Sequence, residues 1–156
     1  MKIQSLLFRV AMGVFVFMKQ IQGCEAGLGE LEQSIENDRL KLSINRQASI
    51  TQKGAFTIHE ISNEQIVIRE YVSQGSVFAV SWHGVRHPDL RNLLGRYFQD
   101  FSKNASRAFR VKGLRSYGIV RARGVVVERS GHMRGVQGRA YVPVLMPHEM
   151  DSSEIR

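Results

Sequence analysis

The chain has 156 residues, of which 43% are hydrophobic and 23% are charged, so it has the composition of one globular domain, which excludes a disordered or fibrous protein. Its single cysteine excludes an intrachain disulfide. The formal net charge of +8 indicates a surface that attracts anions, although surface charge of this kind also serves plain solubility.

The first 26 residues have the pattern of a secretory signal peptide. A basic start, with Lys2 and Arg9, precedes the apolar run VAMGVFVFM at residues 10–18, which is too short to cross a bilayer as a helix. A polar stretch then leads to the small residue Ala26. We predict cleavage after Ala26, which leaves a mature domain of residues 27–156 in the periplasm or outside the cell.

Two alternatives for this segment stay open. The sequence Ile21-Gln22-Gly23-Cys24 resembles a bacterial lipoprotein box, and if that box is used, Cys24 carries lipid and anchors the protein in the bacterial envelope. The other alternative is a buried amphipathic N-terminal helix that remains part of the domain.

At the start of the predicted mature domain, the residue patterns that indicate secondary structure are weak. Leu31, Ile35 and Leu42 recur at roughly helical spacing through a polar stretch, so a weak N-terminal helix is expected at residues 31–42. The polar residues 46–54 that follow are expected to form a connection.

The next segment carries the strongest strand signal. Runs rich in β-branched and aromatic residues, separated by short turn-like clusters, predict an antiparallel meander of three strands at residues 56–61, 66–72 and 77–82. If both turns pair symmetrically, one face of this meander forms the core side and carries Val67, Tyr71, Phe78, Val80 and Trp82.

A strong amphipathic helix is predicted after Pro88-Asp89, with Pro88 suited to its first turn. Its apolar stripe consists of Leu90, Leu93, Leu94, Tyr97, Phe98 and Phe101. Gly95 lies inside this helix, and close approach of the helix to a sheet is one reason for a glycine there.

Two more strands are predicted at residues 117–129 and 135–142. The expected fold is therefore α+β, with an antiparallel meander of about five strands packed by one strong amphipathic helix, plus a weaker N-terminal helix.

Several polar residues are candidates for a site that faces a ligand. Trp82, His83 and His87 lie at the corner between a strand and the strong helix, where ligand-binding residues are common. Glu60 and Glu70 stand on adjacent strands and could be the paired carboxylates of a hydrolase, although the nearby Arg69 makes cross-strand ion pairs the better expectation. His132, between the last two strands, is a further candidate.

Motifs of familiar catalytic chemistry are missing from the sequence. The serines have no nucleophile-elbow setting, there is no phosphate-binding or dinucleotide fingerprint, and no cysteine or carboxylate stands at ligand spacing beside the histidines. We therefore expect no catalytic residue, no cofactor and no metal site.

Short segments in a fixed order run through residues 27–147: Gly27-Leu28-Gly29, Ile58-His59-Glu60-Ile61, Arg69-Glu70-Tyr71-Val72, Val77-Phe78-Ala79-Val80-Ser81-Trp82, Pro88-Asp89-Leu90, Leu93-Leu94-Gly95 with Tyr97-Phe98, Gly131-His132-Met133 and Gly138-Arg139-Ala140-Tyr141-Val142-Pro143. In these segments the chain resembles a family of small exported bacterial proteins of uncharacterised function, domain of unknown function 2844. The resemblance implies export and a shared α+β domain, and it brings no activity, cofactor or catalytic residue.

Three hypotheses for the function follow. The leading one is a non-enzymatic binding or structural module of the envelope, whose partner is an anionic envelope polymer or another envelope protein. The second is an enzyme of unfamiliar type that uses glutamate and histidine residues in a cleft. The third is a nucleic-acid-binding protein, which the pI of about 10.1 alone favours. Export argues against it, so no nucleic acid is expected, and membrane contact is expected only if Cys24 is lipidated.

Overall fold

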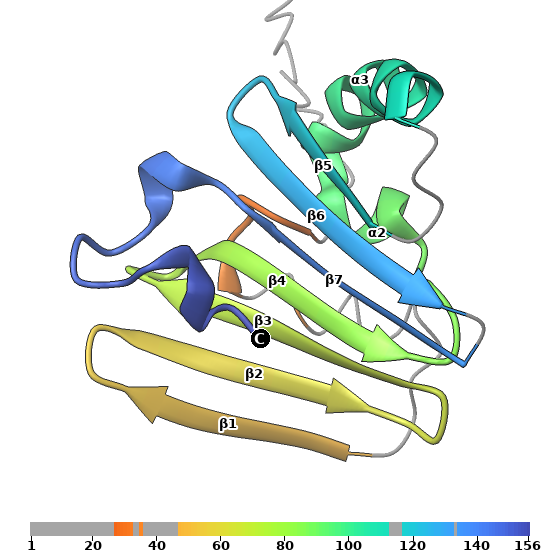
Figure 1. Ribbon diagram of the computed structural model, residues 1–156. Coiled ribbons are helices and arrows are strands. Elements are labelled where there is room, and N and C mark those ends of the chain that lie inside the picture. Colours follow the sequence, from red (N-terminus) through yellow and green to blue (C-terminus); the bar gives the residue numbers. More distant parts are fainter. Residues whose placement is uncertain (1–26, 33–34, 36–46, 113–116, 133) are drawn as a thin grey trace, which may run out of the picture.

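A seven-stranded antiparallel sheet is the centre of the fold (Figure 1). The computed structural model describes residues 27–32, 35, 47–112, 117–132 and 134–156. The strands are β1 (Gln47–Lys53), β2 (Phe56–Ser62), β3 (Ile66–Ser73), β4 (Ser76–Gly84), β5 (Tyr117–Ala122), β6 (Val125–His132) and β7 (Gly135–Tyr141). They lie in the order β1-β2-β3-β4-β7-β6-β5, so β4 and β7 join two runs of hairpins at the middle of the sheet. The α+β class is confirmed.

The prediction of about five strands is wrong, because residues 46–54 and 117–129 each contain one strand more than their residue patterns indicate. Residues 46–54 were expected to be a connection, but β1 pairs along its whole length with β2. β1 is an exposed edge strand, and Ile50 is 69% exposed, so its sequence lacks the apolar alternation of a half-buried strand. Residues 117–129 were expected to be one strand, but they form the hairpin β5–β6, which turns at Gly124 with a φ of 78°.

A β-bulge in β4 changes which residues share a face. β4 has one residue more than β3 between the pairs Tyr71↔Ala79 and Val72↔Val77, and the extra residue is Phe78. Tyr71 and Phe78 therefore belong to one apolar cluster, whereas Val80 and Trp82 belong to another. The expectation that these four side chains and Val67 form one face is wrong, because symmetric pairing of the turn does not allow for the extra residue.

The helices cover the face of the sheet that carries Val80 and Trp82. They are α2 (Leu90–Leu94), the 3-10 turn η2 (Gly95–Tyr97) and α3 (Phe98–Lys112). The carboxylate of Asp89 caps α2 by accepting a hydrogen bond from the backbone N–H of Arg91. All six residues of the predicted apolar stripe pack in the core cluster on this face.

The predicted single helix is broken at Gly95, which has a φ of 47° and a ψ of −124°. An L residue rarely adopts this backbone conformation, so the glycine ends α2 and lets α3 start in a new direction. The glycine therefore allows a turn between two helices. Its backbone also lies close to Gly27, where an added Cβ would be 3.0 Å from the Gly95 nitrogen.

The segment at residues 27–32 packs against both the helices and the sheet. Leu28 is fully buried, and its backbone N–H donates to the carbonyl of Leu93 in α2. The next residue, Gly29, donates to the carbonyl of Val77 in β4. Most of the weak helix expected at residues 31–42 lies outside the described residues, and within it Leu31 forms an isolated antiparallel bridge with Ser76.

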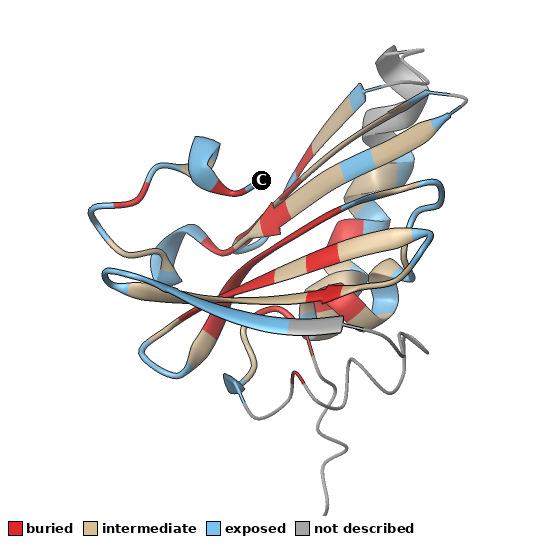
Figure 2. Ribbon diagram, turned by 90° about the horizontal axis from the view of Figure 1, so that it is seen from below, coloured by how far each residue is buried: buried red, intermediate tan, exposed pale blue. Residues whose placement is uncertain are grey.

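The opposite face of the sheet is covered by the C-terminal segment. After β7 the chain makes two 3-10 turns, η3 (Pro143–Leu145) and η4 (Ser152–Glu154), and returns across the sheet on the side away from the helices (Figure 2). We call residues 146–156 the strap. Its apolar side chains Met150 and Ile155 are buried in the cluster of Tyr71 and Phe78.

Candidate functional site

A row of polar side chains crosses the face of the sheet that the strap covers. Cross-strand pairing places Glu60 of β2, Arg69 of β3, Ser81 of β4, Arg139 of β7 and Glu128 of β6 in line. We call these five residues the ladder. Directly paired residues of an antiparallel sheet point to the same side, so all five side chains face the strap.

Each arginine of the ladder is held by a glutamate. Nε of Arg69 lies 2.7 Å from Oε2 of Glu60. Nε and Nη2 of Arg139 both donate to Oε2 of Glu128, at 3.0 and 2.8 Å. These pairs fix the direction of both guanidinium groups, because charge-assisted hydrogen bonds of this kind are strongly directional.

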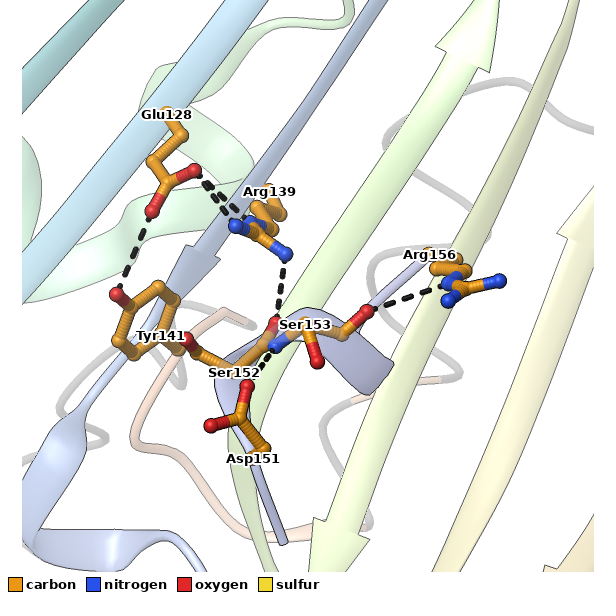
Figure 3. A network of polar contacts seen from close by, with 7 residues as sticks. All are labelled: Glu128, Arg139, Tyr141, Asp151, Ser152, Ser153 and Arg156. Carbon is orange, nitrogen blue, oxygen red and sulfur yellow. Dashed lines mark hydrogen bonds and ion pairs between the residues drawn. The ribbon is translucent and has the colours of Figure 1, made fainter.

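The remaining donors of the ladder bind the main chain of the strap. The carbonyl oxygen of Ser152 accepts from Nη1 of Arg139 at 2.6 Å (Figure 3). The main-chain oxygen of Arg156 accepts from Arg69 and Ser81, at 2.9 and 2.8 Å. It also accepts from the hydroxyl of Tyr71, which in turn accepts from the N–H of Arg156. The strap is therefore docked through backbone groups rather than as an added strand.

The turn of the strap is stabilised by its own side chains. The carboxylate of Asp151 accepts from the N–H of Ser153 at 2.6 Å, and Oε1 of Glu154 accepts from the N–H of Asp151. This reciprocal pair is a capping box at the start of η4. The hydrogen bond from the Ser153 backbone is also the main reason why the pKa of Asp151 lies below its usual range.

Beside the strap, the same face of the sheet is hollowed. Two adjoining hollows of about 560 and 640 Å³ share His83, Gln137, Ser130 and Tyr117, which form the cross-strand row next to the ladder. We call the two hollows together the groove. The strap forms its wall on the ladder side with Ser153, Ile155 and Arg156, and the β6–β7 turn forms the other end with His132 and Arg134.

The groove is cationic. Four arginine side chains line it, those of Arg69, Arg134, Arg139 and Arg156. Arg129 lies in β6 between two residues that face the groove, so its side chain points to the opposite face, where its charge acts on His87. Glu128 is paired with Arg139 and Glu60 with Arg69, so Arg134 and Arg156 supply the excess of positive charge. Chemically, the groove offers guanidinium groups, two imidazoles, hydroxyls and an amide, and this set of donors is suited to carboxylate, sulfate or phosphate groups.

Of the residues suggested by the sequence, the structure brings His83 and His132 together in the groove. Glu60 lies on the same face, as the end of the ladder beside Arg69. Glu70 is 2% exposed and points to the opposite face, because it is adjacent in β3 to a ladder residue. Glu60 and Glu70 are therefore not brought to one site, and the ion pair expected between Glu60 and Arg69 is present.

Trp82 and His87 lie mainly on the helix side. Trp82 is 2% exposed and packs its ring over Gly138, although it also borders one hollow. Its indole N–H donates to Nδ1 of His87 at 3.4 Å. Burial, and secondly the positive charge of Arg129, lower the pKa of His87. Burial also lowers the pKa of Arg129, whose guanidinium nevertheless stays charged at neutral pH.

The possible lipidation site, Cys24, lies outside the described residues. Within the described part of the chain, no three histidine, cysteine, aspartate or glutamate side chains are grouped so that they could hold a metal ion. The helices in that part include none that is long and apolar enough to cross a membrane.

The sequence did not point to the strap or to most of the groove. Tyr117, Ser130 and Gln137 are ordinary surface residues whose alignment depends on the order of β5, β6 and β7. One signal was available. The spacing of Glu128 and Arg139 about the β6–β7 turn would have placed them opposite each other if the turn had been located.

A family model described as "Protein of unknown function (DUF2844)" matches residues 24–155. The comparison with curated proteins finds no match. Among solved structures, the chain is similar to a cysteine-rich secretory protein from Staphylococcus aureus subsp. aureus Mu50, with 6% sequence identity and a TM-score of 0.42. This likeness covers 74% of the chain, and the chain spans 44% of that protein's length.

Proposed function

The chain belongs to the family described as protein of unknown function (DUF2844), and we propose that it is an exported, non-enzymatic member whose groove binds an anionic polymer of the bacterial envelope. The observation that carries the proposal is the charge of the groove, where four arginine side chains gather and two of them, Arg134 and Arg156, are in excess of the ion pairs with Glu60 and Glu128. A lining of this sign raises the local concentration of polyanions and their rate of association.

The shape of the groove favours a polymer over a small molecule. The two hollows adjoin along the row from His83 to Tyr117, so their combined lining extends from the strap to the β6–β7 turn. Tyr117 is 47% exposed there and offers an aromatic face to a sugar ring or an aliphatic stretch of a ligand. Together these features suit an extended chain that carries repeated negative charges.

Export supports the choice of an envelope polymer over nucleic acid. We propose that residues 1–26 direct export, with cleavage after Ala26 or, alternatively, lipidation of Cys24. Mass spectrometry of the chain isolated from its native cells tests it. A new N-terminus at Gly27 or a lipidated Cys24 supports export, whereas an intact Met1 in the cytosolic fraction would contradict it.

Binding is tested by titrating the purified chain with polygalacturonate, a carboxylate polysaccharide, and with uncharged dextran as the control polymer. We expect saturable binding of polygalacturonate at low salt that weakens at moderate salt, because salt screens exposed charges, and no binding of dextran. Absence of polygalacturonate binding at both salt concentrations would refute the proposal.

A pair of matched variants tests whether binding occurs in the groove. Arg134→Gln removes a charge from the groove lining, and Arg123→Gln removes the same charge from the exposed β5–β6 turn outside it. We expect Arg134→Gln to weaken binding about two- to fivefold at low salt, the effect of one exposed ion pair, and Arg123→Gln to have a smaller effect. Equal effects would show that net charge, not the groove, attracts the polymer.

An enzyme of unfamiliar type is the second candidate, because His83 and His132 share the groove with Ser130 and Tyr117. Screening the native chain for hydrolysis of envelope polysaccharides, with His83→Ala and His132→Ala beside it, tests this candidate. Activity that either variant abolishes in a folded protein would favour it.

A further inference from the structure

The strap supplies part of the groove and is not only a cover for the sheet. Its residues Ser153, Ile155 and Arg156 line the hollow of about 560 Å³, the smaller of the two, together with Arg69 and Arg139. The side chain of Arg156 is exposed, and its Nε donates to the carbonyl of Ser153 at 3.2 Å, which leaves the guanidinium at the mouth of the hollow. The position of this charge therefore depends on how firmly the backbone of Arg156 is held.

Two buried residues of the sheet hold that backbone without lining the groove. Tyr71 is 2% exposed and its hydroxyl both donates to the oxygen and accepts from the N–H of Arg156, at 2.8 and 2.9 Å. Ser81 is 3% exposed and donates to the same oxygen at 2.8 Å. Both hydroxyl groups form hydrogen bonds with Arg156, and a buried hydroxyl without such a partner would lower the stability of the fold.

We propose that Tyr71 and Ser81 are positioning residues of an anion-binding site that the strap completes, in which Arg156 faces the ligand together with the sheet residues of the groove. This inference rests on the proposed function, because it concerns the same groove. It adds that the site exists in full only while the strap is docked.

Two consequences follow from linkage between strap and ligand. Weakening the contacts of Tyr71 and Ser81 lowers the fraction of molecules with a complete site, and the apparent affinity falls by the same fraction. Reciprocally, a bound polyanion stabilises the docked strap, because coupling between two binding events is mutual. The second effect is visible in the strap itself, without any measurement of affinity.

The double variant Tyr71→Phe/Ser81→Ala tests the proposal, because it removes two of the three donors to Arg156 and no group that lines the groove. The matched control is Ser73→Ala, which removes a hydroxyl that donates to the carbonyl of Ala55 at the far end of β3. Affinity for polygalacturonate is measured by titration, and the docking of residues 146–156 is measured by amide hydrogen exchange with and without the polymer.

In the double variant three hydrogen bonds to Arg156 are lost. We therefore expect exchange of the strap amides to be about tenfold faster or more and the affinity to fall about three- to tenfold. In the native chain the polymer should slow exchange of the strap, and Ser73→Ala should change neither quantity. If the double variant is poorly folded, Tyr71→Phe alone, which keeps the ring in place, should show the same two effects at smaller size.

The outcomes separate the two proposals. If the native chain binds the polymer, and the variant strap exchanges faster while its affinity is unchanged, the role of the strap is overturned and the binding groove stands. If the native chain binds no polymer and its strap gains no protection, the binding function itself is overturned, and the positioning role is overturned with it.

Discussion

Replacing Gly95 by alanine distinguishes a continuous helix from the broken one by the sign of the change in stability. Inside a continuous helix, the substitution would raise the free energy of unfolding by about 1 kcal/mol, because alanine is the better helix former. In the structure, Gly95 has a φ of 47° and a ψ of −124°. An L residue held in such a sparsely populated region costs about 1–3 kcal/mol.

The neighbourhood of Gly95 leaves little room for relief by movement. A side chain on Gly27 would meet the backbone nitrogen of Gly95 at 3.0 Å, so the two backbones already pack closely. We therefore expect Gly95→Ala to be destabilising by about 1–3 kcal/mol, which for a domain of this size lowers the melting temperature by roughly 2–12 °C.

The assay is thermal unfolding followed by circular dichroism, with urea unfolding as a second measure. Gly135→Ala is the matched control, because Gly135 has no left-handed φ and an added methyl group would make ordinary contacts, the nearest at 3.7 Å to His132. That variant should stay within about 1 kcal/mol of the native chain or be slightly more stable. A higher melting temperature for Gly95→Ala would refute the broken helix and the reasoning from its backbone angles.

Three further predictions concern the packing and the pH dependence of the fold. Gly138→Ala places a methyl group where the Trp82 ring lies, so urea unfolding should show that the free energy of unfolding falls by about 1–3 kcal/mol. In the double variant Trp82→Leu/Gly138→Ala the ring is absent, so the two substitutions together should cost less than the sum of their separate costs. Leu28→Ala should cost about 2–5 kcal/mol in the same measurement, because Leu28 is fully buried; a negligible cost would contradict the packing of this segment. Burial and Arg129 lower the pKa of His87 below 6.5 in the folded state, so the unfolded chain binds a proton at His87 more readily than the folded chain does. Protonation of His87 therefore destabilises the fold: stability is not reduced by it above about pH 6.5 and falls as the pH drops below that value. A plot of melting temperature against pH should accordingly be flatter between about pH 5 and 7 for His87→Gln, and an unchanged slope would contradict this assignment.

The elements with strong periodic signals could be predicted, and those with weak signals could not. The apolar stripe of the helices and the strands β2, β3 and β4 were located because burial imposes a pattern on one side of each element. β1 is exposed at the edge of the sheet, so no pattern of burial marks it. The bulge at Phe78 is also invisible in sequence, because it arises from how two strands are paired.

The candidate site was predictable only in fragments. His83 and His132 were suspected separately, and nothing in the sequence shows that β4 and β7 are neighbours, which is what brings the two histidines to one groove. The strap had even less signal, since its docking uses backbone oxygens and two isolated apolar residues, Met150 and Ile155. Interactions between main chain and side chains carry no periodicity, so they emerge only with the tertiary structure.

The central position of the β4–β7 pairing dictates an order of assembly. A polypeptide delivered amino end first can form the hairpins of β1 to β4 early, yet pairs such as Ala79 with Tyr141 must wait until nearly the whole sequence has emerged. Until then one side of β4, the most deeply buried strand, is an open edge that can pair with other chains. Protection of nascent chains by a holding chaperone should therefore matter most in the interval before β7 arrives.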